Sequence, residues 1–217
     1  AGVDCSDHEV NIKILLNKQV AAGNIDVEER NILLESMTED VASLVLDNNL
    51  RQTKSISLAM ARSQQHHSEY QRYLSWLEQE DQLDRDLEFL PSDEQLTDRI
   101  NRHQPSWTRP ELSVLICYSK VLLKEALAGS DLLSDPWLAS AVTNYFPKAL
   151  VSQFGEAVEA HSLANEIAIN QVVNDLVNRV GFSFFFRQME STGSSAEDVI
   201  RAYTAVIEVL GLKRLWQ

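Results

Sequence analysis

The chain has 217 residues, 44% of them hydrophobic, and its 32 acidic and 19 basic side chains give a formal net charge of −13. This length allows one large domain or two small ones, and the apolar share is sufficient for a sizeable core. The acidic balance argues against nucleic acids and anionic membranes as partners, because both require a positive surface.

Helical periodicity runs through the first part of the chain, where no alternating strand pattern occurs. We predict four helices there, over residues 6–22, 26–47, 53–62 and 70–77. The apolar spacing of the fourth extends to Leu90. Asp26 and Glu29 fit a capping box at the start of the second helix, whereas Asn48 and Asn49 mark a predicted break after it.

A polar stretch between Pro91 and Pro110 separates this part from the rest, so we predict a boundary between domains 1–90 and 91–217. Further helices are predicted over residues 92–102, 108–123, 136–145, 147–154, 163–179, 182–189 and 195–210. The fold class is therefore all-α, a multi-helix orthogonal or bundle-like array of roughly ten helices with no sheet.

The sequence lacks the motifs that hold a dinucleotide or a metal. Its seven glycines stand singly, without a GxGxxG or GxxxxGK[ST] run, so this chain alone is not expected to bind a dinucleotide. The histidines include the neighbours His66 and His67 but no HExxH pair. We expect solvent-exposed helix residues here rather than metal ligands. Nothing resembles the GxSxG of a serine hydrolase.

Cysteine usage and hydropathy indicate the compartment. Cys5 and Cys117 fit no zinc-binding spacing, and two thiols in a chain of this length favour a reducing environment. No apolar run approaches the ~18 residues of a membrane span, and the chain does not begin with a secretory pattern. We therefore expect a cytoplasmic protein that does not enter a membrane.

The opening stretch AGVDCSDHE supports two compatible interpretations. Ser6 and Glu9 fit the S-x-x-E capping box, which contributes about 1 kcal/mol to a helix. A helix N-terminus also attracts anions, because its free N–H groups and its dipole point outward. A substrate carboxylate would suit that position, so these residues are consistent with both a cap and a binding site.

Five segments resemble, in order, the large bacterial NAD-dependent glutamate dehydrogenases: AGVDCSDHEVNIKILLN, TRPELSVLICYSK, SDPWLASAVTNYFP, NDLVNRVGFSFFFR and SSAEDVIRAYTAVIEVLGL. The resemblance covers essentially the whole chain. It implies a C-terminal fragment of a much longer enzyme, in keeping with the missing initiator Met. It also implies oxidation of glutamate to 2-oxoglutarate and ammonia with hydride transfer to NAD, the catalytic and nucleotide-binding residues lying upstream.

Glutamate dehydrogenases generally carry a Gly-Gly-Val-x-x-Ser segment at the return from the nucleotide domain to the substrate cleft, and the pattern falls here on AGVDCS. By this resemblance Val3 and Ser6 line the pocket for the substrate side-chain carboxylate, and Gly2 allows close approach of the backbone. Ala1 replaces the first glycine, and DHE follows Ser6 where the small enzymes have aromatic residues. Acidic groups there repel an acidic substrate unless they turn away.

Two functional hypotheses follow. In the first, residues 1–90 complete the catalytic module of the dehydrogenase and 91–217 form a C-terminal helical domain. The parent is then a homo-oligomer that contains the upstream domains, and the isolated fragment is inactive, with no catalytic, cofactor-binding or metal-binding residue of its own. In the second, the chain is a non-catalytic helical domain for oligomer assembly or regulation. Tight packing of residues 1–60 on the remainder indicates one folded unit, whereas an exposed apolar face indicates a missing upstream domain.

Overall fold

The computed structural model describes residues 2–131 and 134–215. Within these ranges it contains eleven α-helices, one 3-10 helix and no strand, so the predicted all-α class is confirmed. The elements are α1 (Gly2–Ala21), α2 (Val27–Ser36), α3 (Thr38–Arg62), α4 (His67–Gln79), α5 (Asp93–Asn101), α6 (Arg109–Leu127), α7 (Pro136–Tyr145), α8 (Lys148–Glu159), α9 (Ala164–Val180), α10 (Phe184–Thr192), α11 (Ala196–Val209) and η2 (Leu212–Leu215). Among the described helices, none combines the length and the apolar character needed to cross a membrane.

Side-chain caps explain several helix starts. The Asp26 carboxylate accepts a hydrogen bond from Glu29 N (2.8 Å), and the Glu29 carboxylate accepts one from Asp26 N (2.9 Å), which confirms the capping box predicted for α2. Ser92 and Ser195 form equivalent boxes at the starts of α5 and α11. Each box gives a hydrogen-bond partner to backbone N–H groups that have none inside the helix. Because the pattern is local, these helix starts can be predicted from the sequence.

The predicted break at Asn48 and Asn49 is wrong, because both amide side chains find partners without disturbing the helix. Asn49 Nδ2 donates to Val45 O (2.7 Å) within α3, and Asn48 Nδ2 donates to Asp4 Oδ2 of α1 (2.8 Å). Asparagine interrupts a helix when its side chain offers the backbone an alternative partner, and here neither backbone is drawn away. The chain turns instead at Met37, between α2 and α3.

The loop after α4 does not continue the helix. Asp81 and Phe89 have φ values of 52° and 54°, which lie in the left-handed region. The guanidinium of Arg85 holds the loop by ion pairs with Glu78 (2.6 Å) and Asp93 (2.9 Å). The apolar spacing that extends past α4 therefore belongs to a structured loop.

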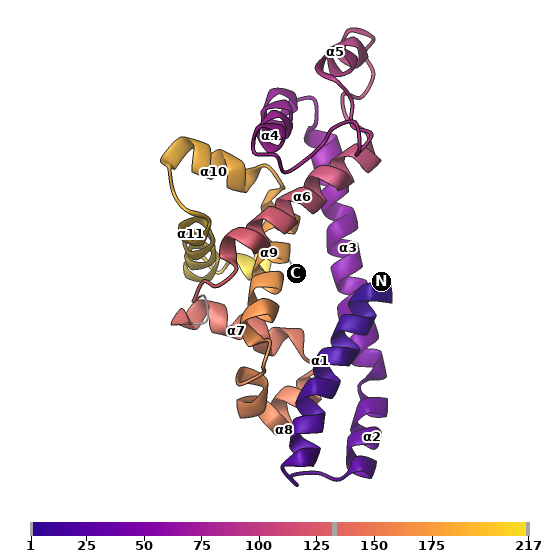
Figure 1. Ribbon diagram of the computed structural model, residues 1–217, viewed down its shortest axis with the longest axis vertical. Helices are drawn as coiled ribbons and strands as arrows, with labels where there is room; N and C mark the ends of the chain where they lie inside the picture. The colour runs from indigo at the N-terminus through magenta and orange to yellow at the C-terminus, as the bar shows by residue number, and fades with distance from the viewer. Residues whose placement is uncertain (1, 132–133, 216–217) are drawn as a thin grey trace. The chain divides into compact units, whose positions relative to one another are not determined.

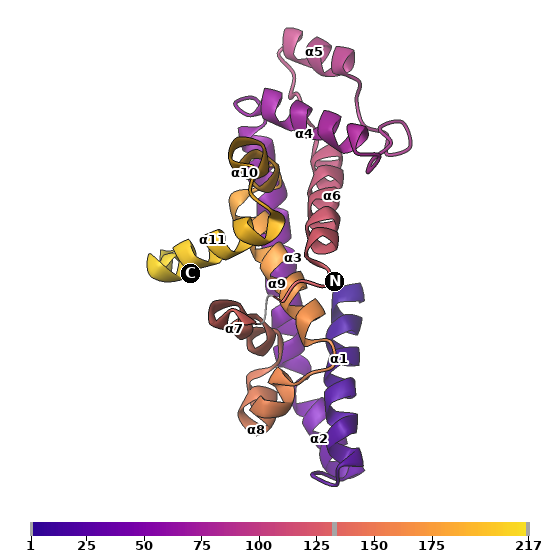
Figure 2. The same ribbon diagram turned by 60° about the vertical axis from the view of Figure 1, so that its left-hand side comes forward.

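The described residues up to Leu50 and Gly129–Val172 form one compact unit. In it α1 and α2 pack as an antiparallel pair, and α7 packs on α8 (Figures 1 and 2). Ile12, Leu15 and Leu16 on the inner face of α1 are at most 2% exposed. They share a core with Phe146, which follows α7, and with residues of α7, α8 and α9, including Val142, Tyr145, Leu150, Val158 and Ile167. The start of the chain and its second half thus bury each other's apolar surface.

Arg51–Ala128 and the described residues from Val173 onward form the second compact unit. Its centre is aromatic: the Tyr73 ring of α4 lies 5.5 Å from that of Phe182 and 5.6 Å from that of Phe186, measured between centroids. Helix α11 packs against α6 and α10. These contacts join α4, α6, α10 and α11 around one core.

Candidate functional site

The residues predicted to contact substrate lie on the outer face of α1. Gly2, Val3 and Ser6 are all exposed, Val3 to 78%. Their spacing of three places Val3 and Ser6 on one face of the helix, and Val10, which is 51% exposed, continues that face. We call Val3, Ser6 and Val10 the outer stripe of α1. Ala1 lies outside the described residues.

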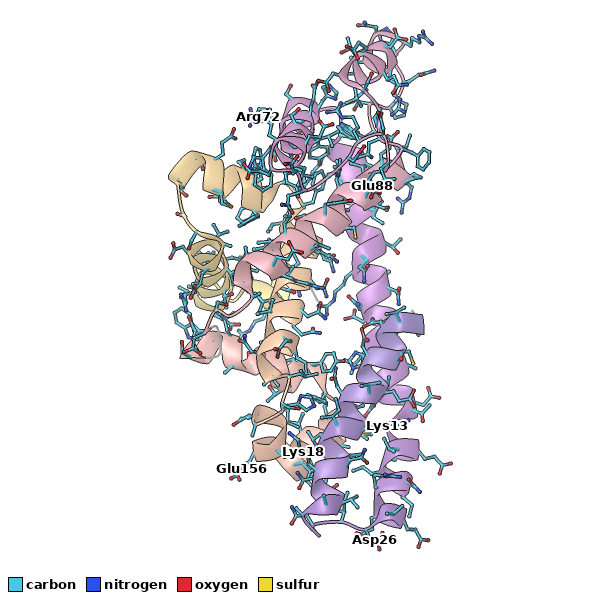
Figure 3. All side chains as sticks on the ribbon, viewed as in Figure 1. Lys13, Lys18, Asp26, Arg72, Glu88 and Glu156 are labelled. Carbon is cyan, nitrogen blue, oxygen red and sulfur yellow. The ribbon has the colours of Figure 1, made fainter. Side chains whose placement is uncertain are left out.

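The predicted capping box of Ser6 and Glu9 is wrong. Helix α1 begins at Gly2, so Ser6 lies four residues inside it. Glu9 forms an ion pair with Lys13, one turn further along α1 (Figure 3), instead of reaching back to Ser6. The residues before Ser6 contain no proline, and the bond from Asn48 to Asp4 supports the first turn. The S-x-x-E pattern is therefore a coincidence of spacing inside a longer helix.

The acidic side chains near the outer stripe have polar partners or point to another face. Asp4 accepts the hydrogen bond from Asn48, and Glu9 is paired with the ammonium of Lys13. Asp7 follows Ser6 directly, and successive residues on a helix point about 100° apart. The repulsion of an acidic ligand expected from the sequence is therefore weakened along this face.

The expectation that the histidines are solvent-exposed is wrong for His8 and His161, which are 4% and 6% exposed. The His8 ring stacks on Tyr145, with centroids 4.1 Å apart and 12° between the planes. Burial lowers the pKa of His8, against the opposing charges of Asp4 and Asp7. Within the described residues His8 Nδ1 has no hydrogen-bond partner. His8 therefore packs as a flat, neutral ring in this core.

His161 holds the same helix through its main chain. Its Nε2 donates to Asn11 O (3.1 Å), and its Nδ1 accepts from Leu163 N (3.1 Å). Because a carbonyl only accepts and an amide N–H only donates, these bonds define a neutral ring with its proton on Nε2. Asn11 Nδ2 also donates to Tyr145 Oη (3.0 Å). Polar contacts therefore tie α1 to the end of α7 and to the segment before α9.

The two faces of α1 thus have different surroundings. The inner face, with His8, Asn11 and Ile12, fixes the rotation of the helix, and this rotation turns the outer stripe away from the core. The sequence contains a signal for His8 that a search for metal motifs overlooks. With Ile12 and Leu15 it completes the i, i+4, i+7 spacing of a buried helix face.

The described residues do not fit a dinucleotide site. Such a site needs glycines at a strand-to-helix turn, where the backbone approaches the pyrophosphate. Here the glycines at positive φ stand at the ends of helices, as Gly23 does after α1 and Gly181 after α9. In the part of the chain that the structure describes, no three histidine, cysteine, aspartate or glutamate side chains are grouped so as to hold a metal.

Comparison with known families agrees with the order of the segments. Residues 1–59 match the family described as bacterial NAD-glutamate dehydrogenase, catalytic domain, and residues 105–217 match that described as glutamate dehydrogenase, C-terminal. A catalytic-domain segment followed by a C-terminal one is the arrangement of part of a dehydrogenase chain. The second match spans more than half of the sequence, and the chain belongs to the glutamate dehydrogenase C-terminal family.

Three curated relatives are each named NAD-specific glutamate dehydrogenase. The protein of Pseudomonas aeruginosa is 50% identical over 211 residues, that of Halomonas elongata 45% over 216, and that of Mycobacterium tuberculosis 37% over 217. The alignments cover 97%, 100% and 100% of this chain, and in each case 13% of the relative. The resemblance seen in the sequence is therefore confirmed, and the chain spans about 13% of the length of these relatives. The roles of Gly2, Val3 and Ser6 stay predictions.

Proposed function

We propose that the chain is the C-terminal part of an NAD-dependent glutamate dehydrogenase, which converts L-glutamate, NAD and water into 2-oxoglutarate, ammonia and NADH. The observation that carries this proposal is the pair of family matches, in catalytic and then C-terminal order, together with relatives that are about eight times longer. In the complete enzyme NAD accepts the hydride. The upstream part of the polypeptide supplies the residues that hold NAD and carry out the chemistry, since those described here do not fit a dinucleotide.

The outer stripe of α1 is the part of this chain that we assign to the substrate. The hydroxyl of Ser6 donates a hydrogen bond to the side-chain carboxylate of glutamate, and Val3 packs on the neighbouring methylene groups. Gly2 lets the backbone pass close to the ligand. Hydrogen bonds to a charged group contribute about 1.5–3 kcal/mol, so one hydroxyl is sufficient for a measurable preference.

The inner face of α1 has a supporting role in this proposal. It packs on α7, α8 and α9 and is held by His161 and Tyr145, so the outer stripe belongs to a firmly packed helix. Large exposed side chains such as Val3 and Val10 suit contact with a further part of the same polypeptide. We propose that the upstream catalytic region of the polypeptide packs beside the outer stripe and encloses the substrate there.

The proposed modules remain residues 1–90, which complete the catalytic module, and 91–217, which form the C-terminal helical domain. We propose a cytoplasmic homo-oligomer as the complete enzyme. The first compact unit draws α1 and α2 from the catalytic-domain match and α7, α8 and α9 from the C-terminal match. The two matched segments therefore depend on each other for their core.

Removal of residues 105–217 from the full-length enzyme tests this proposal against a purely regulatory or assembly role. We expect loss of glutamate-dependent NADH formation, because α1 loses the partners of its inner face. A truncated enzyme that keeps its turnover and changes only its oligomeric state would support the second hypothesis. The isolated 217-residue chain is expected to form no NADH from glutamate and NAD. Turnover by this chain alone would overturn the assignment of the chemistry to the upstream region.

A further inference from the structure

A small hollow in the second compact unit gathers positive charge in an otherwise acidic chain. It lies where α3 and α9 end and where α4 and α10 begin, and its volume is about 70 Å³. One water occupies ~30 Å³ of the liquid, so the hollow admits a group of a few heavy atoms and not a nucleotide. The polar side chains that line it include Arg62, His66, Glu69, Asn178, Arg179 and Arg187.

The charges around this hollow do not cancel. Glu69 is its one acidic lining residue, and it is engaged by His66 Nδ1 (3.0 Å) and by Arg187 (3.3 Å). Burial alone would raise the pKa of Glu69, but hydrogen bonds from Ser183 and His66 and the charge of Arg187 lower it, so the carboxyl remains ionised. Arg62 lines the hollow and has no ion-pair partner within residues 2–131 and 134–215. Since Asp175 compensates the charge of Arg179, the guanidinium groups of Arg62 and Arg187 face the one carboxylate of Glu69, an arrangement that favours an anion.

Arg187 keeps donors to spare despite its existing partner. Arg179 is paired with Asp175, which lies outside the lining, and Arg187 shares Glu69 with His66. A guanidinium carries five N–H donors in a fixed fork, so one carboxylate does not exhaust it. The hollow therefore offers an oxyanion hydrogen-bond donors from several helices.

A second observation narrows the chemistry of the ligand. Asn178 lines the hollow, is only 7% exposed, and its Oδ1 has no hydrogen-bond partner among the described residues. A buried amide oxygen without a donor costs about 1–3 kcal/mol, so the site favours a ligand that brings one. An oxyanion that keeps a proton satisfies the arginines and the amide together.

We propose that this hollow binds hydrogen phosphate. Its unprotonated oxygens accept hydrogen bonds from Arg62 and Arg187, and its P–OH group donates to Asn178 Oδ1. At neutral pH hydrogen phosphate keeps a proton, whereas sulfate does not. A phosphate monoester has its second pKa near 6, so at pH 7 it is mostly the dianion and lacks the donor.

The lining of the site comes from both matched segments of the chain. Ser55 and Ala59, on its α3 side, lie in the segment matched to the catalytic domain, whereas Asn178 and Arg187 lie in the segment matched to the C-terminal family. A bound anion instead joins Arg62, at the end of α3, to Asn178 and Arg187 on α9 and α10. Binding to the folded state alone stabilises that state by mass action, so phosphate raises the melting temperature of this unit.

Titration of the 217-residue chain with inorganic phosphate, sulfate and methyl phosphate at pH 7 and constant ionic strength tests the proposal. Calorimetry gives the affinity and circular dichroism the melting temperature. We expect phosphate to bind at least about tenfold more tightly than either other anion, the loss equivalent to one charged hydrogen bond. Equal binding of all three anions would overturn the proposal in favour of general charge attraction, and no binding would leave water as the occupant and overturn it equally.

Two variants locate the site. Arg62→Gln removes a guanidinium without an ion-pair partner, and Arg72→Gln, on the exposed side of α4 (Figure 3), is its matched control. We expect at least about a tenfold weaker affinity for phosphate in the first and no change in the second. Asn178→Leu removes the unpartnered oxygen, so the chain stays folded while the preference for phosphate over sulfate disappears. Phosphate binding that survives both Arg62→Gln and Asn178→Leu would place the ligand elsewhere.

Discussion

Leu16→Ala measures how much the inner face of α1 contributes to the fold. Leu16 is 0% exposed in the core formed with α7, α8 and α9. Truncation of a fully buried leucine costs the transfer energy of the lost atoms and leaves a cavity, about 3 kcal/mol in total. A chain of this size loses about 2–4 °C of melting temperature per kcal/mol, so we expect a decrease of about 6–12 °C.

Urea unfolding followed by far-ultraviolet circular dichroism provides the assay, and Val10→Ala provides the matched control. Val10 lies on the same helix but is 51% exposed, so its truncation is expected to change the unfolding free energy by less than about 0.5 kcal/mol. The reasoning fails if the two variants destabilise the chain equally. That result would mean that α1 is not part of the core shared with α7, α8 and α9.

Two further predictions concern the loop after α4 and the buried histidines. Phe89 has a φ of 54° and is 91% exposed, so Phe89→Asn relieves backbone strain and should stabilise the chain by about 0.5–1 kcal/mol in urea unfolding. Leu87→Asn, in the same loop, is the control and should bring no gain. Burial lowers the pKa of His8 and His161 below their ordinary value of 6.5, so the unfolded chain binds more protons and stability falls as the pH decreases below about 6.5. His8→Phe keeps a ring against Tyr145 and should flatten part of the fall in melting temperature between pH 7.5 and 5.5, since His161 and His67, whose pKa is also lowered by burial, still titrate.

Each of these predictions has a contradicting outcome. Lower stability of the Phe89→Asn variant would show that the exposed phenylalanine is packed in solution. An unchanged pH dependence in His8→Phe would show that His8 is not buried in its neutral form.

Helix ends were predictable from the sequence where a local rule determines them. The pairs Asp26 with Glu29 and Ser195 with Asp198 act over three residues and need no tertiary partner, so the sequence identifies them. Gly181 likewise ends α9 with φ of 101°, a backbone conformation that other residues avoid. Such signals locate most of the helices of this fold.

The predictions failed where a distant partner decides the outcome. Asn48 bonds to Asp4, 44 residues away, so the predicted helix break does not form. Helix α1 begins at Gly2, before Ser6, and the same bond supports this first turn, so the predicted cap does not form. Phe154, the predicted end of a helix, is only a kink, after which α8 continues to Glu159. Local helix propensity contains no information about contacts between residues that are distant in the sequence.

In the candidate site, too, local features were predictable from the sequence and long-range contacts were not. The resemblance to glutamate dehydrogenases singles out Val3 and Ser6, and helical geometry places them on one face. The spacing with Ile12 and Leu15 indicates that His8 faces the core, whereas its stacking on Tyr145 depends on packing between residues 137 positions apart. The hollow around Asn178 joins four helix ends and was not visible in the sequence.

Ser6→Ala tests the central claim most directly, with Ser43→Ala as an exposed mid-helix serine control on α3. In the 217-residue chain both variants are expected to gain up to about 0.5 kcal/mol of helix propensity, because neither serine is a cap. In the full-length enzyme, steady-state kinetics should show at least about a tenfold rise in KM for glutamate with Ser6→Ala alone, at unchanged KM for NAD. A normal KM for glutamate together with a lower melting temperature would contradict the account, since Ser6 would then support the helix and not touch the substrate.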